Sequence, residues 1–199
     1  MTQELVEAVR AAGVVGAGGA GFPTHVKLAS QVDTVIANGV ECDPLLQCDQ
    51  RLMESRAREM VRGVQLAMQA TGAKQGVLAL KREYGVAEAA IRRAIRPLGE
   101  SSGLSLLLMD SRYPAGDEFV LVYEATGRLV PETGLPLHVG CLVQNVQTLF
   151  NIERAEKGAP VTHRLLTVVG AVGRPVTLWV PLGTSIGDVL GWAGGVQPP

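Results

Sequence analysis

The sequence predicts an α/β fold in which a parallel β-sheet carries helices on both faces. Three short apolar runs, at 32–37, 76–80 and 104–109, alternate with segments of helical periodicity. These runs are mainly apolar and do not alternate regularly with polar residues, which is typical of parallel strands buried on both faces. From residue 160 the order changes to strand, strand, helix, the opening half of a β-grasp unit.

The first element is a helix over 4–12. Apolar residues recur at Leu5, Ala8, Val9 and Ala12, which is the spacing of one helix face. Gly13 follows as a C-terminal cap.

A glycine-rich stretch follows this helix, with five glycines within residues 13–21 and then Phe22, Pro23 and Lys27. Glycine loses more conformational entropy on folding than any other residue, so a stretch this rich in glycine indicates that its backbone must be free of side chains. Such backbone can approach a phosphate or a flat ring, with a cation nearby. We predict a loop that grips a ligand, since a flexible linker would carry serine.

The same stretch also fits the dinucleotide fingerprint at Gly16, Gly18 and Gly21, with Glu41 further on. That fingerprint requires a strand before it and a helix after it. Here a helix precedes the glycines, so a conventional NAD(P) dehydrogenase is the less favoured alternative.

The strand at 32–37 ends in the turn-rich segment 38–44, which carries two carboxylates. Strand ends in open α/β sheets are where ligands bind. A long helix then follows, from Asp49 to about Thr71, with an apolar stripe toward the core, arginines toward solvent and Gly72 as its stop.

Further along, we expect a strand at 76–80, a helix at 86–95, a strand at 104–109 and a helix from about 118 to 127. After an irregular excursion over 128–140, a helix is expected at 143–152. Its first turns hold Asn145 and Thr148, which makes this helix start a second candidate phosphate site.

Residues 164–169 and 176–180 are expected to form a hairpin, followed by a short helix from Ser185 to Trp192. We therefore expect two domains, 1–158 with the parallel sheet and an incomplete one at 159–199. Because the β-grasp pattern stops halfway, we expect an N-terminal piece of a longer protein.

Composition narrows the function. The net charge of −1 gives no electrostatic case for nucleic acid, and no apolar run reaches the roughly 20 residues of a membrane span. No secretory signal is present and three cysteines suit a reducing compartment, so we expect a cytoplasmic protein.

The sequence also offers no catalytic set of its own. Cys42, Cys48 and Cys141 lack C-x-x-C spacing and the histidines are scattered, so we expect no metal site. No Ser-His-Asp set or nucleophile elbow is present. We predict that no side chain is the catalyst and that a bound cofactor carries the chemistry.

Four motifs, at 16–27, 38–44, 113–118 and 145–148, together resemble the flavin-binding, NADH-oxidising subunit of respiratory complex I. The chain is more similar to two relatives of that subunit, the RnfC-type component of the Rnf electron-transport complex and the cobalamin reductase of propanediol-utilisation microcompartments. The segments 113–118 and 61–65 resemble the cobalamin reductase most.

The resemblance implies an FMN site on a Rossmann-like sheet, followed by a β-grasp domain of the SLBB type. It assigns the following residues to FMN: Gly16, Gly18, Gly19, Gly21, Lys27, Asn38, Glu41, Tyr113, Asn145 and Thr148. It assigns three residues to NADH: Phe22, Asp43 and Glu118. The sequence departs from the complex I pattern at Val40, where that pattern has an acid, and at Asp43, where it has a glutamate.

The implied function is electron transfer from NADH to FMN. In the full-length protein, Fe–S clusters in a region missing here would pass the electrons to a corrinoid or to an adenosyltransferase-type partner. Microcompartment proteins are implied as further partners, and the interior of a bacterial microcompartment as a location. Two alternatives stay open: an Rnf-like NADH:acceptor subunit, and a non-catalytic SLBB-type module that binds a ligand or partner.

Overall fold

The structure, a computed structural model, describes residues 2–197. Four of its strands form one parallel sheet in the order β3–β2–β1–β4. Their bounds are β1 (Thr34–Gly39), β2 (Gln75–Lys81), β3 (Leu104–Met109) and β4 (Cys141–Asn145). The chain builds outward from β1 to β3 and then returns to the other side of β1. The strand order therefore reverses between β1 and β4, which is where ligands bind in open α/β sheets.

Helices cover both faces of this sheet, which confirms the predicted fold class. Val35 and Ala37 of β1 join a large core with the helices of one face, while Ile36 joins a smaller core with α5 on the other. The helices of the first face are α1 (Thr2–Ala11), α3 (Cys48–Thr71), α4 (Gly85–Ile95) and α6 (Val146–Glu156), and the second face carries α5 (Glu118–Thr126). Shorter helical elements are α2 (Thr24–Leu28), η1 (Arg96–Leu98), η2 (Glu100–Ser102) and η3 (Pro136–Val139).

Most element predictions are confirmed to within a few residues. The first helix ends before Gly13, whose φ of 70° suits a glycine cap. The long helix begins at Cys48 and stops before Gly72 as expected, although Arg56 has non-helical dihedral angles and kinks it. The short helix α2 was not expected.

The helix predicted over 143–152 is wrong at its start. Residues 141–145 form β4, which pairs in parallel with β1, and α6 begins only at Val146. The apolar run from Cys141 to Val143 completes the sheet beside β1, where its backbone groups find partners. The helix can begin only after Asn145, whose side chain accepts a hydrogen bond from Gln147 N as the N-cap.

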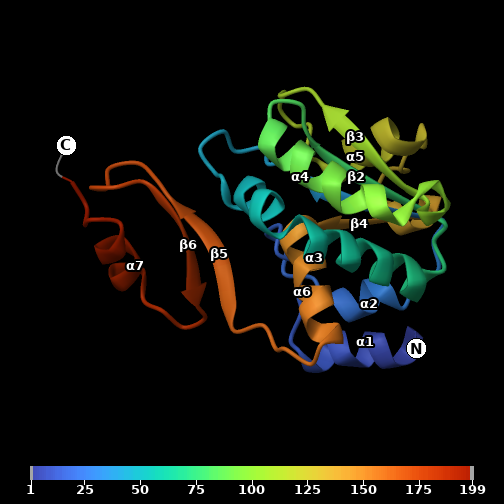
Figure 1. The fold of residues 1–199 in the computed structure, drawn as a ribbon, viewed down its shortest axis with the longest axis horizontal. Coiled ribbons are helices and arrows are strands. Elements are labelled where there is room, and N and C mark those ends of the chain that lie inside the picture. The colour runs from blue at the N-terminus through green and yellow to red at the C-terminus, as the bar shows by residue number, and fades with distance from the viewer. Residues whose placement is uncertain (1, 198–199) are drawn as a thin grey trace.

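The C-terminal part forms a separate two-stranded antiparallel sheet, made of β5 (His163–Val168) and β6 (Val176–Pro181), and helix α7 (Ile186–Trp192). The hairpin and the Ser185 cap of α7 are as predicted, since Ser185 Oγ accepts a hydrogen bond from Asp188 N. Figure 1 shows this part beside the parallel sheet, joined to it by the single segment that leaves α6. Its assignment to a β-grasp domain, and the boundary between residues 158 and 159, remain predictions.

Candidate cofactor-binding site

The glycine loop at residues 16–22 is a closed bend between α1 and α2. Gly16 N donates a hydrogen bond to the Phe22 carbonyl at 2.8 Å, which ties the two ends of the bend together. Gly19 and Gly21 have φ values of 125° and 63°, which L side chains rarely adopt. Gly19 and Gly21 are thus required by the backbone conformation of the loop.

Two distant side chains hold the loop at Ala17. The Ala17 N–H donates to Thr148 Oγ1 at 2.9 Å, in the first turn of α6. Arg164, on β5, donates from Nη2 to the Ala17 carbonyl at 2.6 Å. The loop therefore lies against the beginning of α6 and is contacted by the C-terminal hairpin.

A pair of asparagines marks the carboxyl ends of β1 and β4. Asn38 and Asn145 are register partners in the parallel pairing. Asn38 Nδ2 donates to the Gly116 carbonyl at 2.9 Å, and Asn145 Nδ2 donates to Asp49 Oδ2 at 2.6 Å. Both amides are therefore fixed at the point where the strand order reverses.

A cavity of about 430 Å³ opens at this point, and we call it the glycine-loop cavity. Its volume lies in the range of small-molecule and cofactor pockets. The cavity brings together eight of the predicted site residues: Gly16, Gly18, Phe22, Lys27, Asn38, Glu118, Asn145 and Thr148.

Within this cavity, Lys27 and Gln144 supply hydrogen-bond donors. Lys27 Nζ donates to the carbonyl of Val143, on the free edge of β4, at 3.3 Å, and lies 5.8 Å from the centroid of the Phe22 ring. Gln144 is buried, and its Nε2 has no hydrogen-bond partner within residues 2–197. A buried amide without a partner is costly, so this donor is suited to a ligand acceptor.

A second cavity of about 390 Å³, the acidic cavity, lies beside the first. The two share Gly18, Asn38, Gly116 and Asn145 among their lining residues. The acidic cavity adds two predicted residues, Gly19 and Glu41, together with Cys42, Cys48, Asp49 and Arg164.

Asp49 is the most perturbed group of the site. The pKa of its carboxyl is raised to about 6. Burial is the largest cause and the nearby Glu41 acts in the same direction, while the hydrogen bond from Asn145 opposes the rise. Burial also raises the pKa of the Cys48 thiol. The acidic cavity therefore contains one carboxyl, Asp49, that titrates close to neutral pH.

Three predicted residues do not line either cavity. Gly21 has a structural role in the bend, and Tyr113 is 84% exposed. Asp43 lies on the surface, where its carboxylate accepts a hydrogen bond from Leu45 N and its own N–H donates to Glu41 Oε1. Their assignment to FMN or NADH remains a prediction.

Several residues that line the two cavities were not among the site residues predicted from the sequence. Gln144 was expected in a helix, whereas it precedes Asn145 at the end of β4. Because ligands bind at the carboxyl ends of parallel strands, a correct strand assignment would have indicated Gln144 as a site residue. Asp49 was treated as a helix start and Arg164 as part of a hairpin. Only long-range packing brings these two side chains to the glycine loop, so no local signal marks them.

The dinucleotide-fingerprint alternative is contradicted by the structure. The element before the glycines is the helix α1, and Pro23 lies just before the five-residue α2. In residues 2–197, no group of three or more His, Cys, Asp or Glu side chains is placed to hold a metal ion. No helix in that range is long and apolar enough to cross a bilayer.

Comparison with known proteins gives concordant matches. The Nuo51 FMN-binding domain matches residues 9–154. Cobalamin reductase PduS of Citrobacter freundii is 55% identical over 196 residues, which are 97% of this chain and 42% of that protein. The RnfC-type component of the proton-translocating ferredoxin:NAD(+) oxidoreductase complex of Clostridium ljungdahlii is 37% identical, covering 98% of this chain and 43% of that protein.

Among solved structures, an NAD+-reducing NiFe hydrogenase in the H2-reduced state matches with a TM-score of 0.81 and 27% identity. The match covers 98% of this chain and 39% of the hydrogenase chain. The chain thus spans about two-fifths of the length of each of these relatives.

Proposed function

The chain belongs to the family of the Nuo51 FMN-binding domain, and on that premise we propose that its glycine-loop cavity holds FMN. The chain would then be the flavin module of an electron-transfer protein that takes its electrons from NADH. The observation that carries this proposal is the position of the cavity between the bare glycine loop and the reversal point of the sheet.

The residues of the cavity fit a flat, phosphorylated cofactor. Gly16 and Gly18 line it without side chains, so a ring can approach their backbone. Gln144 Nε2 lacks a partner among the described residues and is suited to a ring carbonyl or nitrogen. The Thr148 hydroxyl accepts its bond from Ala17 N, which leaves its O–H free to donate to an anion.

Lys27 supplies a positive charge that can bind the phosphate of this cofactor. One of its ammonium hydrogens is directed to the Val143 carbonyl, and the others can donate to a phosphate or a flavin oxygen. Asn145 caps α6, whose first turn supplies the positive end of a helix dipole at the same place. We assign Lys27, Asn145 and Thr148 to binding the anionic parts of FMN.

Bound FMN would supply the acceptance of a hydride and its release as single electrons. The residues around the cavity would orient the donor. Phe22 is partly exposed at the rim of the cavity and presents a ring face against which a nicotinamide can pack, and Glu118 lies at the same rim. We propose these two residues as contacts of NADH.

We propose the final electron acceptor from the proteins to which the chain is similar. The 55% identity to a cobalamin reductase favours a corrinoid as the final acceptor, reached through Fe–S clusters in a region outside this sequence. The adenosyltransferase-type and microcompartment partners, and the microcompartment location, stay proposals that rest on the motif resemblance described above. The lower identity to a component of a ferredoxin:NAD(+) oxidoreductase complex makes an Rnf-like role the second candidate.

A titration of the flavin-free chain with FMN tests the cofactor assignment. We expect saturable quenching of flavin fluorescence and a shifted flavin absorbance spectrum. Lys27→Ala should weaken FMN binding by roughly 1–3 kcal/mol, the scale of a lost charge-assisted hydrogen bond. Lys74→Ala is the matched control, because Lys74 is exposed and lies next to β2 at the opposite end of the sheet.

Failure to quench flavin fluorescence would contradict the proposal, as would equal FMN affinities for the two lysine variants. Anaerobic addition of NADH to the FMN-loaded chain tests the donor separately. Loss of the flavin absorbance supports NADH as donor, whereas bound but unreduced FMN would restrict the proposal to flavin binding. Cobalamin binding by a chain that binds no FMN would favour the non-catalytic ligand-binding alternative.

A further inference from the structure

A third cavity, larger than the glycine-loop cavity and the acidic cavity, lies where the two parts of the chain join. It has a volume of about 470 Å³ and is bordered by α3, α6, the linking segment 159–162 and β6. We call it the joint cavity. It shares no lining residue with the glycine-loop cavity or the acidic cavity in the part of the chain that the structure describes, so the proposed FMN site does not account for it.

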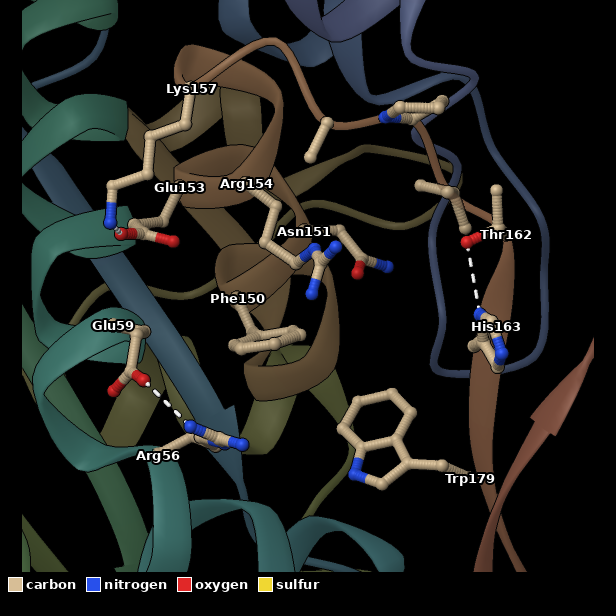
Figure 2. Close-up of a pocket in the computed structure, with 13 residues that line it drawn as sticks. Arg56, Glu59, Phe150, Asn151, Glu153, Arg154, Lys157, Thr162, His163 and Trp179 are labelled. Atoms are coloured by element: carbon tan, nitrogen blue, oxygen red, sulfur yellow. Dashed lines mark hydrogen bonds and ion pairs between the residues drawn. The ribbon is translucent and has the colours of Figure 1, made fainter.

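Asn151 places an unpaired amide in the joint cavity. The residue is only 8% exposed, yet its side chain forms no hydrogen bond with any residue of the range 2–197. Figure 2 shows the amide directed into the open space between α6 and the segment that carries Thr162 and His163. The amide atoms of Asn151 remain accessible from the open space, because the fully buried side-chain atoms without a partner in residues 2–197 belong to Thr24 and Gln144. A ligand in the cavity can therefore replace water as the hydrogen-bond partner of this amide.

Arg154 lies one turn further along α6, on the same face as Asn151. Its guanidinium lies over the Phe150 ring at 5.8 Å from the ring centroid and has neither a hydrogen bond nor an ion pair with another described residue. Figure 2 shows the Arg154 and Asn151 side chains projecting from α6 toward the same open space. Two sets of hydrogen-bond donors therefore converge on one region of the cavity.

The charges around the cavity leave this guanidinium uncompensated. Arg56 pairs with Glu59 at 3.3 Å, and Lys157 pairs with Glu153. Both carboxylates of the lining are thus already matched by cations. The lining has three cationic side chains and two carboxylates, a net charge of +1 with His163 neutral, so an anionic group is the ligand that completes it.

Two aromatic rings form the adjoining wall. Phe150, on α6, and Trp179, on β6, have ring centroids 5.6 Å apart and planes tilted by 40°. Trp179 is 41% exposed, and Figure 2 shows its indole facing the cavity. Aromatic rings stack or pack edge to face at centroid distances of about 4.5–7 Å, so an aromatic ring can bind beside the indole.

From these contacts we propose that the joint cavity is an accessory binding site for a small aromatic carboxylate. Its ring would pack on Trp179 and Phe150, and its carboxylate would accept hydrogen bonds from the Arg154 guanidinium and the Asn151 amide. A guanidinium can bond to both oxygens of a carboxylate. The ligand would thus connect α6 with β6 and fasten the hairpin to the parallel-sheet part.

Tryptophan fluorescence can report this binding directly. The chain has two tryptophans, so Trp192→Phe leaves Trp179 as the only indole. We would titrate this protein with 3-phenylpropanoate, excited at wavelengths where the probe is transparent, in a buffer free of other carboxylates. We expect 3-phenylpropanoate to cause a saturable change in the Trp179 emission. The uncharged 3-phenylpropanamide and the non-aromatic 3-cyclohexylpropanoate should each bind about tenfold more weakly than 3-phenylpropanoate. All three affinities should be the same when FMN is present.

Arg154→Gln in the same background should weaken 3-phenylpropanoate about tenfold, while Arg58→Gln should leave it unchanged. Arg58 is an exposed arginine of α3 that does not line the cavity. The proposal is overturned if the emission does not change saturably, if the uncharged amide binds as well as the acid, or if the two arginine variants behave alike. Failure of the chain to bind FMN would leave these expectations unaltered.

Discussion

Asp49 gives the sharpest test of the site's electrostatics. The residue is 6% exposed, and its carboxylate accepts a hydrogen bond from Asn145 Nδ2 at 2.6 Å. Burial moves its pKa from the ordinary 3.8 to about 6 in the folded chain. Because the folded-state pKa is the higher one, the folded chain binds the proton more tightly than the unfolded chain does.

The sign of the effect follows from this difference. Asp49 stabilises the fold fully at pH values below its unfolded-state pKa, where the carboxyl is protonated in both states. This contribution is lost as the pH rises through the folded-state pKa. With about 1.4 kcal/mol for each pH unit between the two pKa values, the loss amounts to about 3 kcal/mol between roughly pH 4 and pH 7.

Asp49→Asn removes the titration while keeping the size of the side chain and an oxygen that accepts from Asn145. Urea unfolding of the flavin-free proteins at several pH values gives the free energies of unfolding. We expect the variant to gain up to about 3 kcal/mol relative to the wild type between pH 4 and pH 7.

Glu132→Gln serves as the control for this measurement, because Glu132 is exposed and makes neither a hydrogen bond nor an ion pair with the residues that the structure describes. Its free energy of unfolding should follow that of the wild type across the pH range. If the Asp49→Asn curve also runs parallel to the wild-type curve, the reasoning about a buried, proton-binding carboxyl is refuted.

Two further predictions concern packing and the hold on the glycine loop. A Cβ at Gly63 would clash with the Leu149 carbonyl oxygen, so Gly63→Ala must push α3 and α6 apart. This should lower the free energy of unfolding by about 1–3 kcal/mol. An unchanged midpoint of urea unfolding would contradict the close approach of the two helices at Gly63. Arg164→Gln removes the guanidinium bond to Ala17 and should speed FMN release by about fivefold, or about 1 kcal/mol, in a stopped-flow displacement assay. The melting temperature of the flavin-free chain should change little, whereas a lower melting temperature with unchanged FMN release would assign Arg164 to the fold alone.

The sequence predicted the parallel sheet well because its strands are short, apolar and separated by clear helical patterns. It failed at β4. In that strand only Cys141 to Val143 are apolar, and the polar Gln144 and Asn145 lead directly into the next helix without a turn. Periodicity cannot separate such a strand from the helix that follows it. The boundary is set by pairing with β1, which is a long-range contact.

The candidate site likewise combines residues that the local sequence indicates with residues that only long-range contacts bring into place. The glycine loop and Lys27 are recognisable locally, because bare backbone and a nearby cation are contiguous in sequence. Asp49 and Arg164 carry no local sign of their position. Gln144 becomes informative only when it is known to be buried and without a partner among the described residues. Local sequence therefore indicated the glycine loop, and the family motifs indicated Asn38 and Asn145, which line the same cavity. Residues outside those motifs, such as Asp49 and Arg164, were not predicted.

The contact between Ala17 and Thr148, across 131 positions of the chain, has a consequence for biosynthesis. The glycine loop is translated early, but the first turn of α6 that anchors it emerges only after most of the sheet has been made. Long-range pairings of this kind form late in folding. FMN binding should accordingly be a late event in maturation. Ribosome-bound nascent chains arrested before residue 148 should therefore carry no FMN.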